Sequence, residues 1–223
     1  MTNPAIRLEF KKFGGLKYIS HLDLQRAILR FIKRAHLPIR YTEGFNPHPK
    51  IVFALTMSVG MESVSELVDI YLKRDEENPE EPVITPEEFA KRLSKILPNG
   101  LEIVSASFPE KDFSQIESAD YTITLVKNDS AWLSDFIKNA FLSPVEILKK
   151  TKSGEKLVNI SPLVFSVSTE ENDKECRVFA RLSAKPNEYL SPDLFVKALC
   201  QYDNGSGIDS WQVIREKINF KES

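Results

Sequence analysis

Hydrophobic and charged residues alternate near the start of the chain in the pattern of a half-buried strand. Ile6, Leu8 and Phe10 occupy every second position with charged residues between them, and a Phe-Gly-Gly turn follows. A helix is then predicted from Ser20, whose hydroxyl suits an N-cap, to Pro38, which ends it. The other elements of the first half are three short strands, a helix and a last strand, expected at residues 39–42, 51–55, 66–73, 86–97 and 101–107.

The second half repeats this order more loosely. Its helices are expected at residues 130–141 and 191–202, and the second begins with serine followed by proline, an order favoured at helix starts. Its strands are expected at residues 121–126, 163–168, 176–183 and 211–220, with a hairpin of residues 146–150 and 157–160 inserted.

The order of these elements predicts the fold class and the domains. In each half it reads β-α-β-β-α-β, the order of a ferredoxin-like sandwich. We therefore expect an α+β protein of two tandem ferredoxin-like sandwiches, with an added strand in the first. The two domains are predicted over residues 1–110 and 118–223, and residues 109–119 form the linker between them.

Composition and length exclude several classes of protein. The chain has 223 residues, of which 42% are hydrophobic and 28% charged, as in ordinary globular proteins. No apolar run reaches the ~18 residues of a membrane span, and the N-terminus lacks the pattern of a signal peptide, so we expect a cytoplasmic protein without a membrane partner. The two cysteines, Cys176 and Cys200, fit a reducing compartment and are too few for a four-thiolate metal site.

Positive charge is concentrated in the first fifty residues. The whole chain has a net charge of −2, whereas residues 1–50 hold ten basic and three acidic side chains. Local fields rather than the overall charge decide whether phosphate is attracted to a surface. An anionic partner, with RNA as the leading candidate, is therefore predicted for this part of the chain.

The predicted helix that starts after Ser20 separates basic from apolar residues. Its apolar positions, expected to face the core, are Leu24, Ile28, Phe31 and Ala35. Its basic positions, which fall within about one third of the circumference, are Arg26, Arg30, Lys33 and Arg34. Solvated helix faces usually mix charges of both signs, and Asp23 is the one acidic residue of this helix. The stripe is either a solvated charged face or a surface for an anion.

The loop at residues 42–50 is built to be stiff. Gly44 permits backbone conformations closed to other residues, and Pro47 and Pro49 fix φ and favour extended neighbours. Such a loop would stack Phe45 on a base, while other side chains contact base edges or phosphate. The alternative is a structural turn with Phe45 in the core. The candidate binding residues in and beside this loop are Arg40, Phe45, Asn46, His48 and Lys50.

Three residues are candidates for catalysis: His21, Asp23 and His48. At a helix N-terminus the imidazole of His21 is expected to be neutral and able to act as a base. Asp23 has the chemistry of a nucleophile or base, but its spacing from Ser20 favours a role in capping. No metal site is expected, because His21 and His36 lie at opposite ends of one helix. Walker, GxGxxG and GxSxG motifs are absent from the sequence.

Three stretches of the first half carry a resemblance to a known family. They are SHLDLQRA at residues 20–27, RAHLPIRYTEGFNPHPKIVFAL at 34–55 and SVGMESVSELVDIYL at 58–72. They resemble the radical SAM-linked family, the DUF2344 domain, in which an arginine-rich helix precedes a GFNPHPK loop. Many relatives have serine where this chain has Thr42, which keeps the hydroxyl. The residues that match the family pattern are Arg26, Arg30, Arg34, Gly44, Phe45, Asn46, Pro47, His48, Pro49 and Lys50.

The resemblance implies a partner. Members are bacterial and are encoded beside a radical SAM protein or fused to it, which implies a cytoplasmic protein that works with such an enzyme. This chain lacks the CxxxCxxC motif, so the iron–sulfur cluster and S-adenosylmethionine are expected only in the partner. The neighbourhood of relatives, near ribosomal or RNA-processing genes, makes tRNA or rRNA the expected substrate.

Three functions from different classes are therefore left open. The first is an RNA-binding accessory protein that presents tRNA or rRNA to the radical SAM enzyme. The second is a protein–protein docking module that binds this enzyme without contacting RNA. The third is a metal-independent RNA-processing enzyme in which His21 or His48 acts as acid or base.

Overall fold

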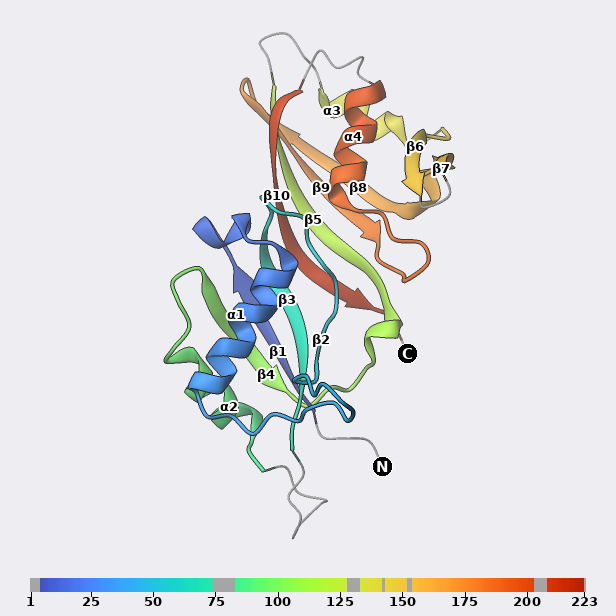
Figure 1. Cartoon of the computed structure of the whole chain (residues 1–223). Helices are drawn as coiled ribbons and strands as arrows, with labels where there is room; N and C mark the ends of the chain where they lie inside the picture. The colour runs from blue at the N-terminus through green and yellow to red at the C-terminus, as the bar shows by residue number, and fades with distance from the viewer. Residues whose placement is uncertain are drawn as a thin grey trace. The chain divides into compact units, whose positions relative to one another are not determined.

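The computed structural model describes residues 5–73, 83–127, 133–141, 143–151, 154–202 and 208–222 (Figure 1). The chain divides into two compact units, Met1–Phe113 and Ser114–Ser223, here called unit 1 and unit 2. The boundary falls within residues 109–119, which the sequence analysis assigned to a linker. The end of this segment is not a linker, because strand β5 already begins at Ile116.

Unit 1 is a four-stranded antiparallel sheet with helices between its strands (Figure 1). The strand order is β4-β1-β3-β2, and each neighbouring pair is antiparallel. The elements are β1 (Ala5–Lys12), the 3-10 helix η1 (Gly14–Tyr18), α1 (His21–Arg34), β2 (Ile51–Phe53), β3 (Glu62–Tyr71), α2 (Pro86–Ser94) and β4 (Leu101–Ser107).

Both helices of unit 1 cover the same face of its sheet. Buried side chains of the two helices, of β1 and of β3 form one hydrophobic cluster. On α1 the buried residues are Leu24, Ile28 and Ile32, whereas Phe31 and Ala35 are only partly buried. The four residues predicted to face the core do so, although Phe31 and Ala35, which pack against the cluster, are less buried than Ile32. Residues spaced by four follow one line along the helix, and Ile32 continues the line of Leu24 and Ile28.

The short strand predicted at residues 39–42 does not form as a continuous strand, so the sheet of unit 1 has no added strand among the described residues. The structure has two isolated bridges instead, between Ile39 and Leu72 and between Tyr41 and Pro49. The amide of Arg40 donates to the carbonyl of Tyr71 at 2.8 Å, and the chain then turns back on itself. Proline lacks the amide hydrogen that a strand ladder needs, and Pro38 directly precedes this segment while Pro47 and Pro49 lie in the stretch that folds back on it.

The C-terminus of α1 is closed by a turn and by an arginine of α2. His36 has φ +52°, and the amide of Leu37 donates to the carbonyl of Ile32 at 3.2 Å, as in a Schellman motif. Arg92 then donates from Nη2 to the carbonyls of Ala35 and His36, at 2.8 and 2.9 Å. The guanidinium thus binds two carbonyl groups at the negative end of the helix dipole.

Replacing Arg92 with leucine is expected to destabilise unit 1. The variant loses two hydrogen bonds from a charged donor and leaves two helix-end carbonyls without them, which is expected to lower the free energy of unfolding by about 2 kcal/mol. Urea denaturation measures this change. Lys91→Leu is the control, since the ammonium of Lys91 lies 4.0 Å from Glu88 on an exposed surface. Equal stability of the two variants would contradict the role given to Arg92.

Unit 2 has the same order of strands and helices, with a hairpin inserted. Its four-stranded sheet has the order β10-β5-β9-β8, again antiparallel, and β6 and β7 form a separate two-stranded sheet. The predicted start of its first helix at Ser130 lies outside the described residues. The elements are β5 (Ile116–Lys127), α3 (Leu133–Ala140), β6 (Glu146–Thr151), β7 (Gly154–Asn159), β8 (Val164–Glu171), β9 (Glu175–Ser183), α4 (Pro192–Tyr202) and β10 (Ile208–Phe220).

The core of unit 2 lies between its sheet and its two helices. The rings of Phe141, directly after α3, and Phe195 of α4 are stacked with 5.1 Å between centroids. Ile123 of β5 and Val178 of β9 are fully buried beneath the helices. The chain is thus a mixed α+β protein with antiparallel sheets. Within the described ranges, no helix has both the length and the apolar character needed to cross a membrane.

Candidate nucleic-acid interface

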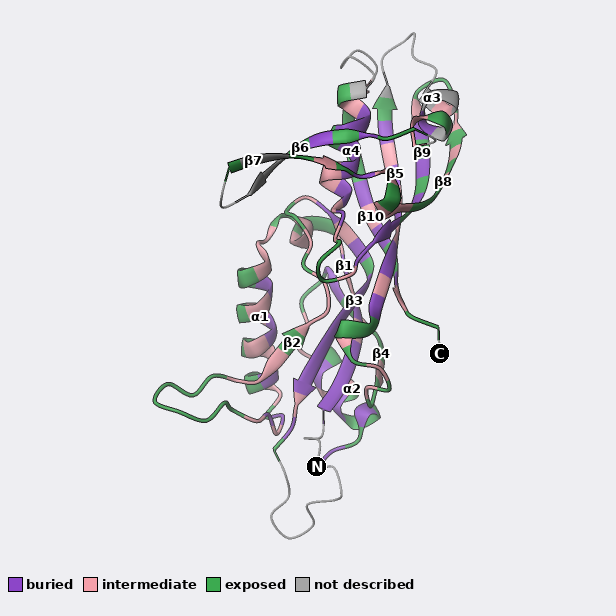
Figure 2. Cartoon of the chain, turned by 90° about the vertical axis from the view of Figure 1, so that its right-hand side faces the viewer, coloured by how far each residue is buried: buried purple, intermediate pink, exposed green. Residues whose placement is uncertain are grey.

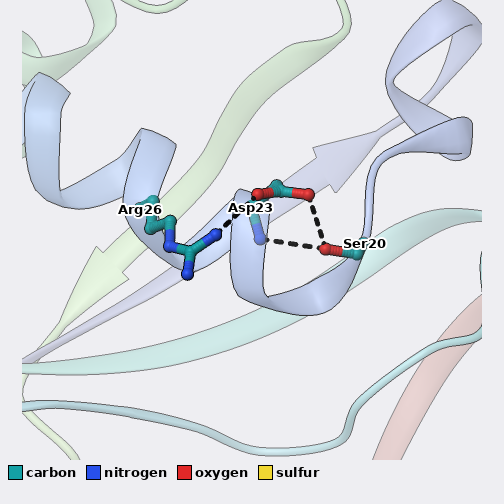
Figure 3. Close-up of polar contacts among 3 residues, drawn as sticks. All are labelled: Ser20, Asp23 and Arg26. Carbon is teal, nitrogen blue, oxygen red and sulfur yellow. Dashed lines mark hydrogen bonds and ion pairs between the residues drawn. The ribbon is translucent and has the colours of Figure 1, made fainter.

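The N-terminus of α1 is closed by Ser20, Asp23 and Arg26 (Figure 3). The amide of Asp23 donates to Ser20 Oγ at 3.2 Å, and Ser20 Oγ donates to Asp23 Oδ2 at 2.7 Å. Arg26 Nη1 donates to Asp23 Oδ1 at 3.1 Å. The hydrogen bond from Ser20, and then that from Arg26, hold the pKa of Asp23 below its usual value. Both carboxylate oxygens therefore have partners within the helix, which is the capping role that the spacing from Ser20 indicated.

The predicted basic stripe of α1 lies on its exposed side. The side chains of Arg26, Arg30, Lys33 and Arg34 are all exposed, opposite the buried line that starts at Leu24. Arg26 is paired with Asp23, whereas Arg30, Lys33 and Arg34 have no ion pair with any described residue. The charge of Arg30 also acts on Asp23, but this one carboxylate does not balance the four basic side chains, so the face attracts anions.

An exposed arm follows α1. Figure 2 shows the segment between α1 and β2 extending away from the rest of unit 1, and residues 41–48 are all exposed. Phe45, near its tip, has a relative exposure of 110%, as large as that of a residue with no packing around it. The alternative that Phe45 belongs to the core is therefore wrong. A large aromatic side chain fully in water is available for contact, and its burial against a partner would be favourable.

Thr42 holds the two sides of the arm together. Its amide donates to the carbonyl of His48 at 2.7 Å, and its hydroxyl accepts from the amide of His48 at 3.0 Å. Closer to the sheet, the amide of Lys50 donates to the carbonyl of Arg40 at 2.8 Å. Gly44 has φ +123°, a conformation that other residues rarely adopt. The expected stiff loop is therefore a closed arm, and the hydroxyl of Thr42 forms one of the hydrogen bonds that close it.

Replacing Thr42 with valine is expected to loosen the arm. The variant keeps the β-branched shape and the backbone bond but loses the hydroxyl acceptor of the His48 amide, a change of about 1 kcal/mol for one neutral hydrogen bond. Faster amide hydrogen exchange at His48, together with an unchanged exchange rate in β3, would show this loosening. Thr42→Ser is the control, because it retains the hydroxyl. Unchanged exchange at His48 in the valine variant would contradict this account of the arm.

The side chains beside the arm differ in how they are held. Arg40 Nη2 donates to Glu43 Oε1 at 2.9 Å, and the ammonium of Lys50 lies 4.2 Å from the ring centroid of Tyr71. The side chains of Asn46 and His48 are exposed and make no hydrogen bond with the described part of the chain. Tyr71 was not among the residues singled out from the sequence, and its place beneath Lys50 depends on the pairing of the arm with β3.

His21 is packed rather than presented. It is half-buried, with its Nε2 3.0 Å from Gln25 Nε2 and its ring edge-on to Phe53 at 5.1 Å between centroids. Burial lowers the pKa of His21 below its ordinary value, and the charge of Glu66 opposes this shift. Burial thus favours the neutral imidazole, in the same direction as the effect expected of the helix dipole.

The catalytic candidates do not form one site. His21 opens α1 and His48 follows its C-terminal end, and a helix of this length spans ~20 Å. In the part of the chain that the structure describes, no group of three histidine, cysteine or carboxylate side chains is placed to hold a metal ion. The arrangement instead suits binding, with an exposed aromatic ring, free polar side chains and three unpaired cations within consecutive elements of unit 1.

The fold and this surface define a mixed α+β protein with antiparallel sheets and a basic helix followed by an exposed aromatic arm. The chain belongs to a family described as an uncharacterized protein conserved in bacteria, DUF2344, whose model matches residues 5–192. No curated protein matches the sequence.

Comparison with solved structures supports the fold alone. A chain of the Cbf5-Nop10-Gar1 complex is similar at 10% identity with a TM-score of 0.51, over 99% of this chain and 50% of that one. This chain therefore spans half the length of that protein. An unknown protein from Galdieria sulphuraria, at 8% identity, aligns with 99% of this chain and 100% of its own, with a TM-score of 0.28. The encapsulated DyP-type peroxidase from Mycobacterium smegmatis, at 9% identity, aligns with 92% of this chain and 85% of its own, with a TM-score of 0.24.

Proposed function

We propose that this protein binds structured RNA, tRNA or rRNA, through α1 and the arm and presents it to a partner radical SAM enzyme. The observation that carries the proposal is the full exposure of Phe45 on a closed arm directly after the unpaired cations of α1. In this account the cations contact the phosphate backbone, and Phe45 stacks on an unpaired base.

The two kinds of contact divide the work of recognition. Phosphate contacts from Arg30, Lys33 and Arg34 supply affinity and position the RNA without reading its sequence. Stacking on Phe45 requires a base that is not paired, so the arm selects a loop, a bulge or an end. The free side chains of Asn46 and His48 lie beside that ring in the sequence and supply hydrogen bonds to base edges.

The proposal assigns chemistry to the partner and binding to this chain. Each unit has the element order of a ferredoxin-like sandwich, and we assign both units to that topology, with the inserted hairpin in unit 2. The iron–sulfur cluster and S-adenosylmethionine would be held by the radical SAM partner, in the bacterial cytoplasm. The packed environment of His21 and the capped carboxylate of Asp23 give no support to a catalytic role in this chain.

RNA binding at two salt concentrations tests the proposal. Purified protein is titrated into labelled bacterial tRNA and rRNA fragments at about 0.05 and 0.2 M salt. Each phosphate contact adds about 0.9 to the magnitude of the slope of log K, the association constant, against log salt concentration. We expect binding that weakens at least tenfold between the two conditions. Absence of binding at the lower concentration would overturn the proposal.

An exposed aromatic arm also suits a second function, that of a docking module for the radical SAM enzyme without RNA contact. Phe45 would then fill an apolar pocket of that enzyme, as aromatic anchors do at protein interfaces. A pull-down of the radical SAM partner that tolerates high salt and is lost in Phe45→Ala, together with no RNA binding, would favour this function.

A further inference from the structure

The sheet of unit 2 has one face that no described helix covers. Helices α3 and α4 pack on the other face, where the amide of Ser134 in α3 donates to Glu171 Oε2 at 2.9 Å. On β9 the residues of the covered face are buried, including Val178 and Ala180. The alternate residues, Arg177, Phe179 and Arg181, point to the uncovered face and are all exposed.

Phe179 is an exposed aromatic ring near the middle of this face. Its relative exposure is 37%, and it lies opposite Thr122 of β5 and Ser168 of β8 in the strand register. A packed sheet centre normally holds such a ring on its buried side. An aromatic residue on a central strand of a four-stranded antiparallel sheet is the arrangement with which RNA-recognition motifs stack bases.

The two arginines beside Phe179 are held by carboxylates. Arg181 donates from Nε and Nη2 to the two carboxylate oxygens of Asp120, at 2.7 and 3.1 Å, and Arg177 Nη2 donates to Glu175 Oε1 at 2.9 Å. Bidentate pairing fixes the plane of the Arg181 guanidinium. Fixed guanidinium planes and aromatic rings both serve as surfaces on which bases stack.

The spacing of these three side chains selects the form of the nucleic acid. Residues two apart on a strand are separated by about 6.8 Å. That distance is about twice the 3.4 Å between successive nucleotides of one strand in a duplex. Successive bases therefore reach Arg177, Phe179 and Arg181 only when the strand is extended and unstacked.

A groove of about 850 Å³ lies at one end of the same face and includes Arg181. Its volume is within the range of small-ligand sites, ~300–1,000 Å³. Lys217 in this groove makes no ion pair with a described residue and is placed for a phosphate. The carboxylates of Glu117 and Glu222 also line the groove and would accept from the amino groups of bases. Its other lining residues are Ser118, Phe165, Ser166, Ile218, Asn219, Phe220 and Lys221.

We propose that this uncovered face is a second binding site, which takes a short single-stranded RNA segment with a base stacked on Phe179 and a phosphate beside Lys217. The site consists of residues other than α1 and the arm, although the choice of RNA over DNA rests on the function proposed above. Strand β5 presents Thr122 opposite Phe179 and Thr124 opposite Arg177, so Phe179 provides the ring at the middle of this face, and the exposed Phe165 lies in the groove at its end.

Binding of a fluorescein-labelled uridine decamer, which has no stable secondary structure, to the full chain tests this site by fluorescence anisotropy. Loss of one stacked base is expected to weaken binding of the Phe179→Ala variant about tenfold. Phe179→Tyr keeps a ring and is expected to bind within about twofold of the unchanged protein. Phe108→Ala removes a phenylalanine of similar exposure, 46%, from unit 1 and is expected to bind as the unchanged protein does.

The outcomes separate this site from the surface of unit 1. The same titrations are repeated in a protein in which Arg26, Arg30 and Arg34 are replaced by alanine. If Phe179→Ala still weakens decamer binding tenfold in that protein, the site on unit 2 binds independently of α1. If Phe179→Ala fails to fold, the Arg177→Gln, Arg181→Gln double variant takes its place, with the same tenfold loss expected. No binding of the decamer, or equal binding by the unchanged protein and the tested variant, would overturn the inference. If the variant with Arg26, Arg30 and Arg34 replaced by alanine binds tRNA as the unchanged protein does, the function proposed for unit 1 is contradicted. The test of the site on unit 2 remains valid in that case.

Discussion

Replacing Arg26, Arg30 and Arg34 together with alanine is expected to lower the affinity for tRNA by a few hundredfold at about 0.1 M salt. This figure assumes one phosphate contact for each arginine. Each contact contributes about 0.9 to the slope of log affinity against log salt, which amounts to about 0.9 log units of affinity over one decade of salt concentration. The variant is expected to keep the stability of the unchanged protein, because the three side chains are exposed and lie opposite the buried line of α1. Filter binding at several salt concentrations gives both the affinity and the slope.

A variant of equal charge serves as the control for this prediction. Lys91, Lys95 and Lys197 are exposed and lie outside α1 and the arm, so their joint replacement by alanine removes the same charge from elsewhere. We expect the control to change affinity by less than about tenfold, through the overall field alone. Equal losses in the two triple variants would show that net charge, and not the face of α1, determines binding.

Replacing Phe45 with alanine is expected to weaken RNA binding by about tenfold or more without changing stability. Stacking of one base on an aromatic side chain contributes ~1–3 kcal/mol. Since Phe45 is fully exposed, its removal creates no cavity and the thermal unfolding temperature should stay the same. The salt slope should also stay the same, because stacking releases no counterions.

Two further measurements make the Phe45 prediction specific. Phe45→Tyr keeps an aromatic ring and is expected to bind RNA nearly as the unchanged protein does. Tyr18→Ala removes another exposed ring, of 66% exposure, from η1 and is expected to have no effect. A Phe45→Ala variant that unfolds at lower temperature would show that the arm packs in solution, and its exposure would then carry no argument for binding.

The local elements of this chain could be predicted from its sequence because local patterns determine them. Alternation at Ile6, Leu8 and Phe10 marked β1, and Ser20 marked the start of α1 through its cap. Gly44 was expected to adopt a conformation closed to other residues, and its φ of +123° confirms this. These features depend on neighbours within about four residues, which a sequence displays directly.

Contacts between distant segments could not be predicted in the same way. Arg92 binds the end of α1 across more than fifty residues, and no periodicity indicates such a bond. The periodicity of α1 placed Phe31 on the core side but did not reveal that Ile32 would be the more deeply buried of the two, because the sheet beneath the helix decides this. The full exposure of Phe45 depends on the pairing of Arg40 with Tyr71 and Lys50, which turns the arm away from the core.

On the uncovered face of unit 2, the sequence shows the alternation of residues but not which side of the strand the helices cover. The alternation of Arg177, Phe179 and Arg181 with buried residues is visible in the sequence, and β9 was expected where it lies. Which of the two faces the helices cover follows only from the packing of α3 and α4. Phe179 would have been assigned to the core on hydrophobicity alone, whereas the structure leaves it exposed.

Ultraviolet crosslinking of the protein to tRNA tests most directly whether α1 and the arm are the RNA-binding surface. Trypsin cleaves after Arg40 and Lys50, so residues 41–50 leave as one peptide that contains Phe45 and His48. We predict that mass spectrometry finds nucleotides attached to this peptide and that the attachment disappears in the Arg26, Arg30 and Arg34 variant. Crosslinks confined to other peptides, with none in residues 41–50, would contradict the proposed interface.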